Sequence, residues 1–246
     1  MKIRMTFNFN DVGIFWINCS QNIKRHEHMK SVLNKNFPNN KHFHVEAVMY
    51  TPKYQGVTMA HVVAILKGIA SRKPFIILED DVTIDATKLN IKKLENEINN
   101  FEKIPDVVYI GLSGWGTRIN QYKLIFQKRK EMFYQWNEKI VFNKGAKCQD
   151  IGSDYFIRVD DMYGAHAILY LSNEYAMKTL KLCIMAVELD KPHDIYLPKI
   201  MKKGMALGQR EPWFYQLESI GGQEKYTKLN LSNIPKLVLE EIAFSG

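Results

Sequence analysis

Three adjacent carboxylates, Glu79, Asp80 and Asp81, are the residues of this sequence best suited to chemistry. They directly follow residues 75–78, a short apolar run that predicts a strand. Ligands of open α/β sheets bind beyond the carboxyl ends of strands. Because side chains alternate along an extended chain, Glu79 and Asp81 can converge while Asp80 points elsewhere.

Carboxylate oxygens at such a position suit Mg²⁺ or Mn²⁺, which keep bound waters and bridge to substrate phosphates. The triplet therefore predicts a two-ligand metal site, in which the metal would neutralise a leaving diphosphate. An acidic loop that caps the next helix, or that faces water, would show the same three residues. The surrounding sequence has to decide between these interpretations.

A second polar group, His193 and Asp194, follows Pro192 and precedes a short helix-like segment. Asp194 is a candidate general base or acceptor anchor, and His193 is a candidate neighbour of the metal. Asp194 could equally cap the helix that follows it. The spacing of these residues does not choose between the two roles.

The glycine-rich stretch 113–118 follows a predicted strand over residues 107–110 and suits the lip of a cleft. Trp115 and Trp136 could stack on a sugar ring, or pack at the edge of the core. Between residues 123 and 142, aromatic and charged residues alternate as in strands, which predicts an antiparallel insertion.

The elements that must position these residues are predicted from apolar runs and capping residues. Residues 12–18 form a nearly continuous apolar run, as in a buried parallel strand. Ser20 is the predicted cap of a helix that ends near Asn36, and Thr58 is the predicted cap of a second helix. The remaining predicted elements are strands over 43–50, 75–78, 107–110 and 166–171, a helix over 87–101, and a helix capped by Ser172 with Glu174 in its first turn. In the Thr58 helix, apolar residues recur at helical spacing: Met59, Val62, Val63, Leu66 and Ile69. This order predicts an α/β fold.

The composition is that of one globular domain spanning residues 1–246, with 46% hydrophobic and 24% charged residues. The net charge of +8 comes from scattered lysines and arginines, which favours a solvated surface over nucleic-acid binding. It would also suit peripheral association with a membrane. We found no signal peptide or long apolar stretch, which predicts a cytoplasmic protein, in a host cytoplasm if the source is viral. The three cysteines lack metal-binding or paired spacing, so no disulfide partner is expected.

Several short motifs occur in the order found in a known enzyme family. Leu78-Glu79-Asp80-Asp81 matches a Leu-Glu-Asp-Asp hallmark without change. The other matching segments are residues 17–21 with Arg25, residues 58–61, residues 169–172 with Ala176, residues 192–194, and Pro212 with Gln216. Over residues 12–112 and 164–216 the chain thus resembles glycosyltransferase family 25, which contains lipopolysaccharide and collagen galactosyltransferases and relatives in large viruses. The chain departs from the family at Ser20-Gln21, where Asp-Arg is usual, and at Ala60, where Ser is usual.

The resemblance implies a GT-A fold, a Rossmann-like, mostly parallel sheet flanked by helices. Residues 12–112 would bind the nucleotide sugar, residues 113–220 would form the acceptor side, and residues 221–246 would be a tail. The implied donor is a UDP-sugar, with Mn²⁺ or Mg²⁺ as cofactor and a glycan, glycolipid or glycoprotein hydroxyl as acceptor.

The resemblance also distributes roles among the site residues. The implied donor-binding residues are Asn18, Ser20, Arg25, His61, Glu79 and Asp80. The implied metal ligands are Glu79, Asp81 and His193, and the acceptor-side residues are Trp115 and Arg118. Asp194 would be the base if the reaction inverts configuration. Two other functions stay open: a metal-dependent phosphohydrolase or nuclease, and a nucleotide-sugar-binding module with a degenerate site.

Overall fold

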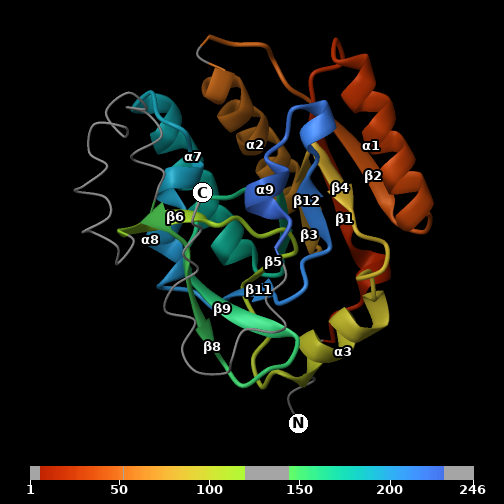
Figure 1. The fold of residues 1–246 in the computed structure, drawn as a ribbon, viewed down its shortest axis with the longest axis vertical. Helices are drawn as coiled ribbons and strands as arrows, with labels where there is room; N and C mark the ends of the chain where they lie inside the picture. Colours follow the sequence, from red (N-terminus) through yellow and green to blue (C-terminus); the bar gives the residue numbers. More distant parts are fainter. Residues whose placement is uncertain (1–5, 52, 120–143, 230–246) are drawn as a thin grey trace.

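The computed structural model describes residues 6–51, 53–119 and 144–229, and its centre is an eight-stranded sheet (Figure 1). The strand order is β2-β1-β3-β10-β5-β11-β9-β8. The strands are β1 (Gly13–Asn18), β2 (Lys41–Glu46), β3 (Phe75–Glu79), β5 (Val107–Tyr109), β8 (Lys147–Asp150), β9 (Phe156–Asp161), β10 (Ala167–Tyr170) and β11 (Ala206–Gln209). Only β9 and β10 run opposite to the other strands, so the sheet is mixed. The predicted α/β class is confirmed.

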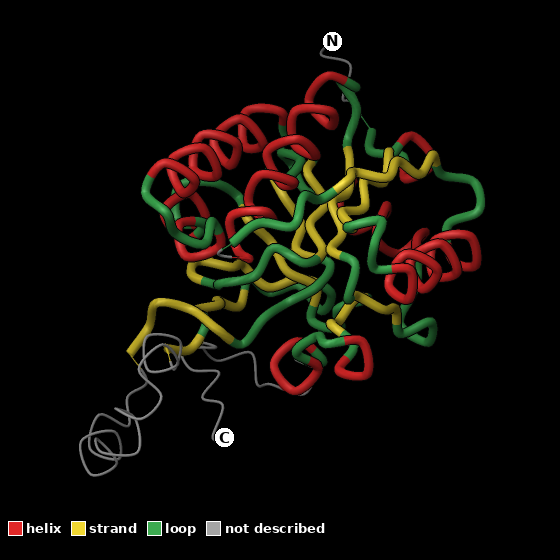
Figure 2. The backbone as a smooth tube through the Cα atoms, turned by 90° about the horizontal axis from the view of Figure 1, so that it is seen from above, coloured by secondary structure: helices red, strands yellow, loops and turns green. Residues whose placement is uncertain are grey.

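Helices cover both faces of this sheet, as the view in Figure 2 shows. The main helices are α1 (Ile23–Asn36), α2 (Lys53–Ala70), α3 (Ile91–Asn100) and α7 (Asn173–Glu188). Residues of α2 and α7 share one apolar cluster with Phe15 and Ile17 of β1. Residues of α1 and α3 share the other cluster with Ile14 and Trp16. Burial on both faces explains why this strand is apolar at consecutive positions.

Two of the three predicted helix caps were wrong. Asn22, not Ser20, caps α1, because its side-chain oxygen accepts from the backbone N–H of Arg25. Ser20 instead hydrogen-bonds the carboxylate of Glu46 through both its backbone N–H and its hydroxyl. Helix α2 begins at Lys53, so Thr58 is buried inside it. The cap at Ser172 and the end of α1 at Asn36 are confirmed.

The boundaries of other predicted elements also differ. Strand β2 ends at Glu46, and residues 47–51 leave the sheet as a loop, because pairing with β1 stops at Asn18. Helix α3 begins later than predicted, since Asn90 caps it. The predicted antiparallel insertion, with Trp136, lies outside the described residues.

Several short elements complete the structure, and of these only the helical segment after His193 was predicted from the sequence. They are β4 (Val82–Ile84), β6 (Trp115–Ile119), β7 (Lys144–Gly145), β12 (Phe214–Gln216), α8 (Pro198–Met201), α9 (Glu224–Thr227) and three 3-10 turns, Phe9–Asp11, Asp194–Tyr196 and Glu218–Ile220. β12 pairs antiparallel with β4, which follows the acidic triplet directly. In the part of the chain that the structure describes, we find no helix of the length and apolarity needed to span a membrane.

Close packing of α2 on β3 generates a first prediction. A Cβ added at Gly68 of α2 would overlap the ring of Phe75 at the start of β3. We expect Gly68→Ala to lower the free energy of unfolding by about 1 to 3 kcal/mol, because overpacking outweighs the gain in helix propensity. Urea denaturation measures this change.

The matched control is Gly13→Ala, where the nearest atoms to a new Cβ, on Phe15 and Phe43, lie 3.4 Å away. Equal stability of the two variants would contradict the close approach of α2 to β3.

Candidate active site at the end of strand β3

The acidic triplet lies where β3 ends, in the centre of the sheet. Strand β3 is buried through Leu78, Glu79 is its last residue, and Asp80 and Asp81 form the turn into β4. The parallel neighbour β1 places Ile17 beside Glu79. Asn18, the last residue of β1, therefore reaches the same edge of the sheet.

Asp80 is held by two partners from the first βα unit. Nη1 of Arg25 lies 2.5 Å from Oδ1 of Asp80, and the amide of Asn18 donates to Oδ2 at 2.7 Å. Arg25 also donates from Nε to the carbonyl oxygen of Ile220 at 2.8 Å. Asp80 thus connects the end of β1, the first turn of α1 and the end of β3, and both of its oxygens are used.

Glu79 and Asp81 converge on a different group, as the alternation of side chains predicts. The amide Nε2 of Gln216 lies 3.1 and 3.2 Å from the two carboxylate oxygens of Asp81 and 3.5 Å from Oε2 of Glu79. The nearest cationic group to Asp81 is Nη2 of Arg25, 3.9 Å from Oδ2. The two carboxylates therefore share one neutral donor, and the cations that act on them, Arg25 and, for Glu79, also Lys53, make no close ion pair with either.

Burial and mutual repulsion act on both of these carboxyl groups. Burial, followed by the charge of Asp80, raises the pKa of Glu79 to about 7. Burial, followed by the charge of Glu79, raises the pKa of Asp81 to about 7. Such shifts mark negative charge that the protein alone does not neutralise. A hard divalent cation would neutralise this charge, and the oxygen donors of the pair fit Mg²⁺ or Mn²⁺.

Among the described residues, no group of three or more His, Cys, Asp or Glu side chains is arranged to hold a metal ion. A cation bound by Glu79 and Asp81 would therefore complete its coordination with water or with oxygens of a ligand. This is the way in which Mg²⁺ commonly binds beside substrate phosphates.

Two neutral imidazoles lie behind Glu79. Nε2 of His61, on α2, is 3.2 Å from Oε1 of Glu79, and burial lowers the pKa of His61 to about 3. The ring of His193 packs against His61 with 4.3 Å between centroids, and its Nδ1 lies 3.2 Å from Oγ1 of Thr58. His193 thus contacts Thr58 and His61 rather than the carboxylates, and its role as a metal ligand stays a prediction.

Asp194 lies close enough to Glu79 for their charges to interact. Burial, followed by the charge of Glu79, raises the pKa of Asp194 to about 6, although backbone hydrogen bonds at Asp194 and Ile195 oppose the shift. The residue also begins the 3-10 turn Asp194–Tyr196. The predicted cap role is wrong, because His193 occupies the cap position and Asp194 lies inside the turn. The role of Asp194 as general base or acceptor anchor stays a prediction.

The remaining predicted residues lie farther from the carboxylate pair or are described only in part. Ser20 is exposed and bonded to Glu46, away from Asp80. Trp115 and Arg118 lie on β6, which pairs with β7. The acceptor role of these two residues stays a prediction.

Gln216 is the site residue that the sequence analysis did not assign. It comes from β12, more than a hundred residues after Asp81, and reaches the carboxylates because β12 pairs with β4. Its only sequence signal was its position after Pro212 in the closing segment of the family resemblance.

Comparison with known proteins says nothing about this chain beyond its α/β fold. No family model and no curated protein matches the chain. One similar solved structure is the CTP:phosphocholine cytidylyltransferase of Streptococcus pneumoniae, at 9% identity over 85% of this chain and 94% of that chain, with a TM-score of 0.37. Another is apo mouse xyloside xylosyltransferase 1, at 13% identity over 78% and 82%, with a TM-score of 0.34. Similarity this distant does not assign an activity, and membership of family 25 is not shown.

The contacts of Arg25 generate a second prediction. Removing its charge in Arg25→Met leaves two partly buried carboxylates, Asp80 and Asp81, without their cation. We expect the free energy of unfolding at pH 7 to fall by about 1 to 3 kcal/mol. Urea denaturation without added metal measures this loss.

The neighbouring Lys24→Met is the matched control, because Lys24 makes an exposed hydrogen bond to the carbonyl oxygen of Ser219. Its expected change is below about 0.5 kcal/mol. If both variants lost the same stability, the Arg25–Asp80 contact would not anchor the site.

Proposed function

We propose that this protein is a metal-dependent glycosyltransferase that moves a sugar from a nucleotide diphosphate donor, with a uridine nucleotide expected, to a hydroxyl group. The acceptor class is a glycan, glycolipid or glycoprotein. One observation carries the proposal: the half-buried Glu79 and the buried Asp81 converge on the Gln216 amide, incompletely neutralised, at the carboxyl end of a central strand. The unchanged Leu-Glu-Asp-Asp motif supports the same function by resemblance.

The donor chemistry requires positive charge where the diphosphate leaves. A divalent ion held by Glu79 and Asp81 would supply that charge as a Lewis acid. Arg25 adds fixed positive charge, and its bond to Asp80 keeps the guanidinium beside the pair. In the tautomer that carries hydrogen on Nε2, the neutral His61 would donate a hydrogen bond to Glu79 and so orient this carboxylate.

The acceptor chemistry requires a base only if the reaction inverts configuration. Asp194 is half-buried and feels the charge of Glu79, and its pKa of about 6 is closer to neutrality than that of an ordinary aspartate. A carboxylate with such a pKa accepts a proton from a hydroxyl more readily in the transition state. In a retaining reaction Asp194 would have no such duty.

Ligand binding tests the proposal first, as the third prediction. Thermal shift and calorimetry with UDP, GDP, CMP and their sugar conjugates, with and without Mn²⁺, should show selective, metal-dependent stabilisation by one diphosphate nucleotide. At a hundredfold excess over Kd, the stabilisation should reach about 2.7 kcal/mol. Asp81→Asn should abolish it, because the substitution removes one of two metal ligands.

The matched control is Asp85→Asn, since Asp85 follows β4 and bonds Thr87 outside the carboxylate pair. Nucleotide binding without metal dependence, or its survival in Asp81→Asn, would contradict the proposed site. Metal binding without nucleotide binding, together with phosphoester hydrolysis, would favour the phosphohydrolase alternative. Tight nucleotide binding with neither transfer nor donor hydrolysis would favour a binding module.

A fourth prediction concerns Asp194. With the nucleotide sugar identified above, Asp194→Asn should reduce kcat for transfer by about 10² to 10⁴, because the variant lacks the general base. Nucleotide affinity should change less than about twofold, since Asp194 does not hold the donor.

Asp190→Asn provides the comparison, because Asp190 lies four residues earlier and bonds Gln55 and Tyr54 at an exposed position. An unchanged kcat in Asp194→Asn would show that this residue is not the base, as expected for a retaining enzyme.

A further inference from the structure

Helix α2 is apolar on two opposite sides. Its inner side buries small or apolar residues in the core, among them Ala60, Ala64 and Ile65. Its outer side carries Met59, Val63 and Leu66, one helical turn apart, with 44%, 40% and 50% of their surface exposed. A helix on a protein surface ordinarily turns polar residues to water. The outer side of α2 is therefore an unusual surface.

Exposed apolar residues continue from α2 onto the preceding loop. Val48, Met49 and Tyr50 follow β2 and are 64%, 70% and 54% exposed. The loop packs on the first turns of α2, because a Cβ at Gly56 would overlap the carbonyl oxygen of Val48 and lie 3.3 Å from the Cβ of Tyr50.

The same surface extends to the edge strand β2. There, the half-exposed ring of Phe43 stacks on Phe15 on the α2 side of the sheet. We call these residues the α2 face: Phe43, Val48, Met49, Tyr50, Met59, Val63 and Leu66.

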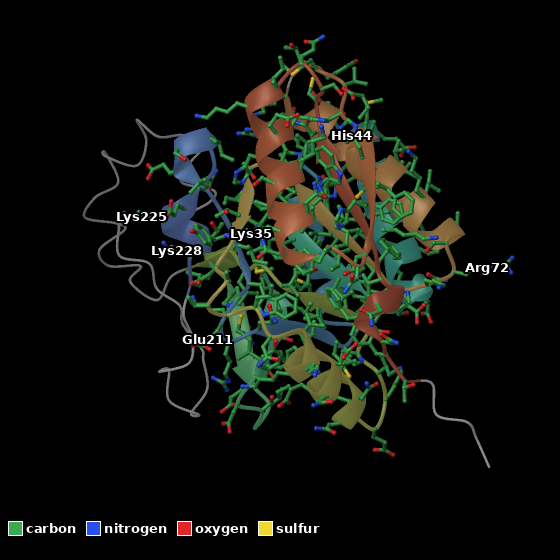
Figure 3. The ribbon with its side chains drawn as sticks, turned by 90° about the vertical axis from the view of Figure 1, so that its right-hand side faces the viewer. Lys35, His44, Arg72, Glu211, Lys225 and Lys228 are labelled. Carbon is green, nitrogen blue, oxygen red and sulfur yellow. The ribbon has the colours of Figure 1, made fainter. Side chains whose placement is uncertain are left out.

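The α2 segment itself carries only basic charge, and the acidic residues Asp11, Glu46 and Asp190 lie at its margins. Residues 47–74 contain four basic side chains, Lys53, Lys67, Arg72 and Lys73, and no Asp or Glu. All four are exposed, and Lys73 pairs with Asp11 at 2.8 Å. Arg72 projects away from the body of the protein just beyond α2 (Figure 3). A stretch that carries half of the net charge of +8 therefore borders the exposed apolar residues.

We propose that the α2 face docks on the surface of an anionic lipid membrane. Two contributions bind peripheral proteins to bilayers. Apolar side chains enter the membrane interface, and lysines and arginines attract anionic headgroups. A second copy of this chain fits the face less well, because a symmetric contact would bring the same basic residues together. Anionic headgroups complement this charge.

Docking in this way would bring the candidate site near the membrane. The loop of residues 47–51 follows Glu46, which pairs with Asn18 at the carboxyl end of β1. Asn18 in turn bonds Asp80. One end of the docked face, the loop of residues 47–51, would therefore lie at the sheet edge that carries the acidic triplet, where a lipid-linked acceptor could reach the site. The docking itself does not depend on the proposed transferase activity.

Vesicle sedimentation tests the docking, as the fifth prediction. Vesicles of about three parts phosphatidylcholine to one part phosphatidylglycerol should pellet the protein, and phosphatidylcholine alone should pellet much less. The double variant Val63→Glu/Leu66→Glu should reduce the bound fraction by more than about tenfold, because it removes apolar contacts and adds repulsive charge.

The matched control is Ile151→Glu, an exposed isoleucine in the turn between β8 and β9, which should bind like the unmodified protein. Thermal melting verifies that each variant is folded.

A second measurement avoids disruptive substitutions. An environment-sensitive fluorophore on Leu66→Cys, in a Cys19→Ser background, should shift to the blue with anionic vesicles, whereas the same label on Ile151→Cys should not. Failure of the unmodified protein to bind anionic vesicles would overturn the proposal. Equal binding by the double variant, or equal shifts at both labels, would also overturn it. A dimer in solution that the double variant abolishes, without vesicle binding, would assign the face to a second copy.

Discussion

The hydrogen-bonded contact of Asp80 with Arg25 and Asn18 organises the whole candidate site. It joins the end of β1, the start of α1 and the end of β3, three elements that the sheet alone would leave independent at their ends. Because the guanidinium of Arg25 pairs closely with Asp80, it lies farther from Asp81 and neutralises the charge of Glu79 and Asp81 only in part. The negative charge of Asp80 is thus balanced, whereas the charges of Glu79 and Asp81 are not. Unbalanced negative charge of this kind favours the binding of a cation.

The second constraint is the distance between α2 and β3. Gly68 allows the helix to approach Phe75. About two turns earlier on the same helix, His61 reaches Glu79. The buried imidazoles of His61 and His193 are neutral, so they fill the space behind the carboxylate without cancelling its charge. A lysine at the position of His61 would neutralise Glu79 and compete with a metal. The packing therefore preserves the negative charge of the site.

The sequence predicted those parts of the site that depend on local geometry. Alternation along a strand separated Asp80 from Glu79 and Asp81, and the apolar run before them placed all three at a strand end. Gln216 could not be predicted in this way, because its contact depends on the pairing of β12 with β4 across a long stretch of chain. Ser20 was misassigned for a related reason. Ser20 and Asn22 lie two residues apart and have similar capping ability. Ser20 hydrogen-bonds Glu46, which is distant in the sequence, and Asn22 caps the helix.

Periodicity showed that α2 is apolar, but it did not show which side faces the core. The structure buries Ala60, Ala64 and Gly68, whose small size lets the helix lie close to the sheet. Met59, Val63 and Leu66 are consequently left outside, although they are the bulkier apolar residues. Because the fold does not need their burial, each could be polar at little cost to stability, and their exposure to water is unfavourable for solubility. Their apolar character, with basic residues bordering it, is therefore better explained by contact with a surface outside the chain than by folding.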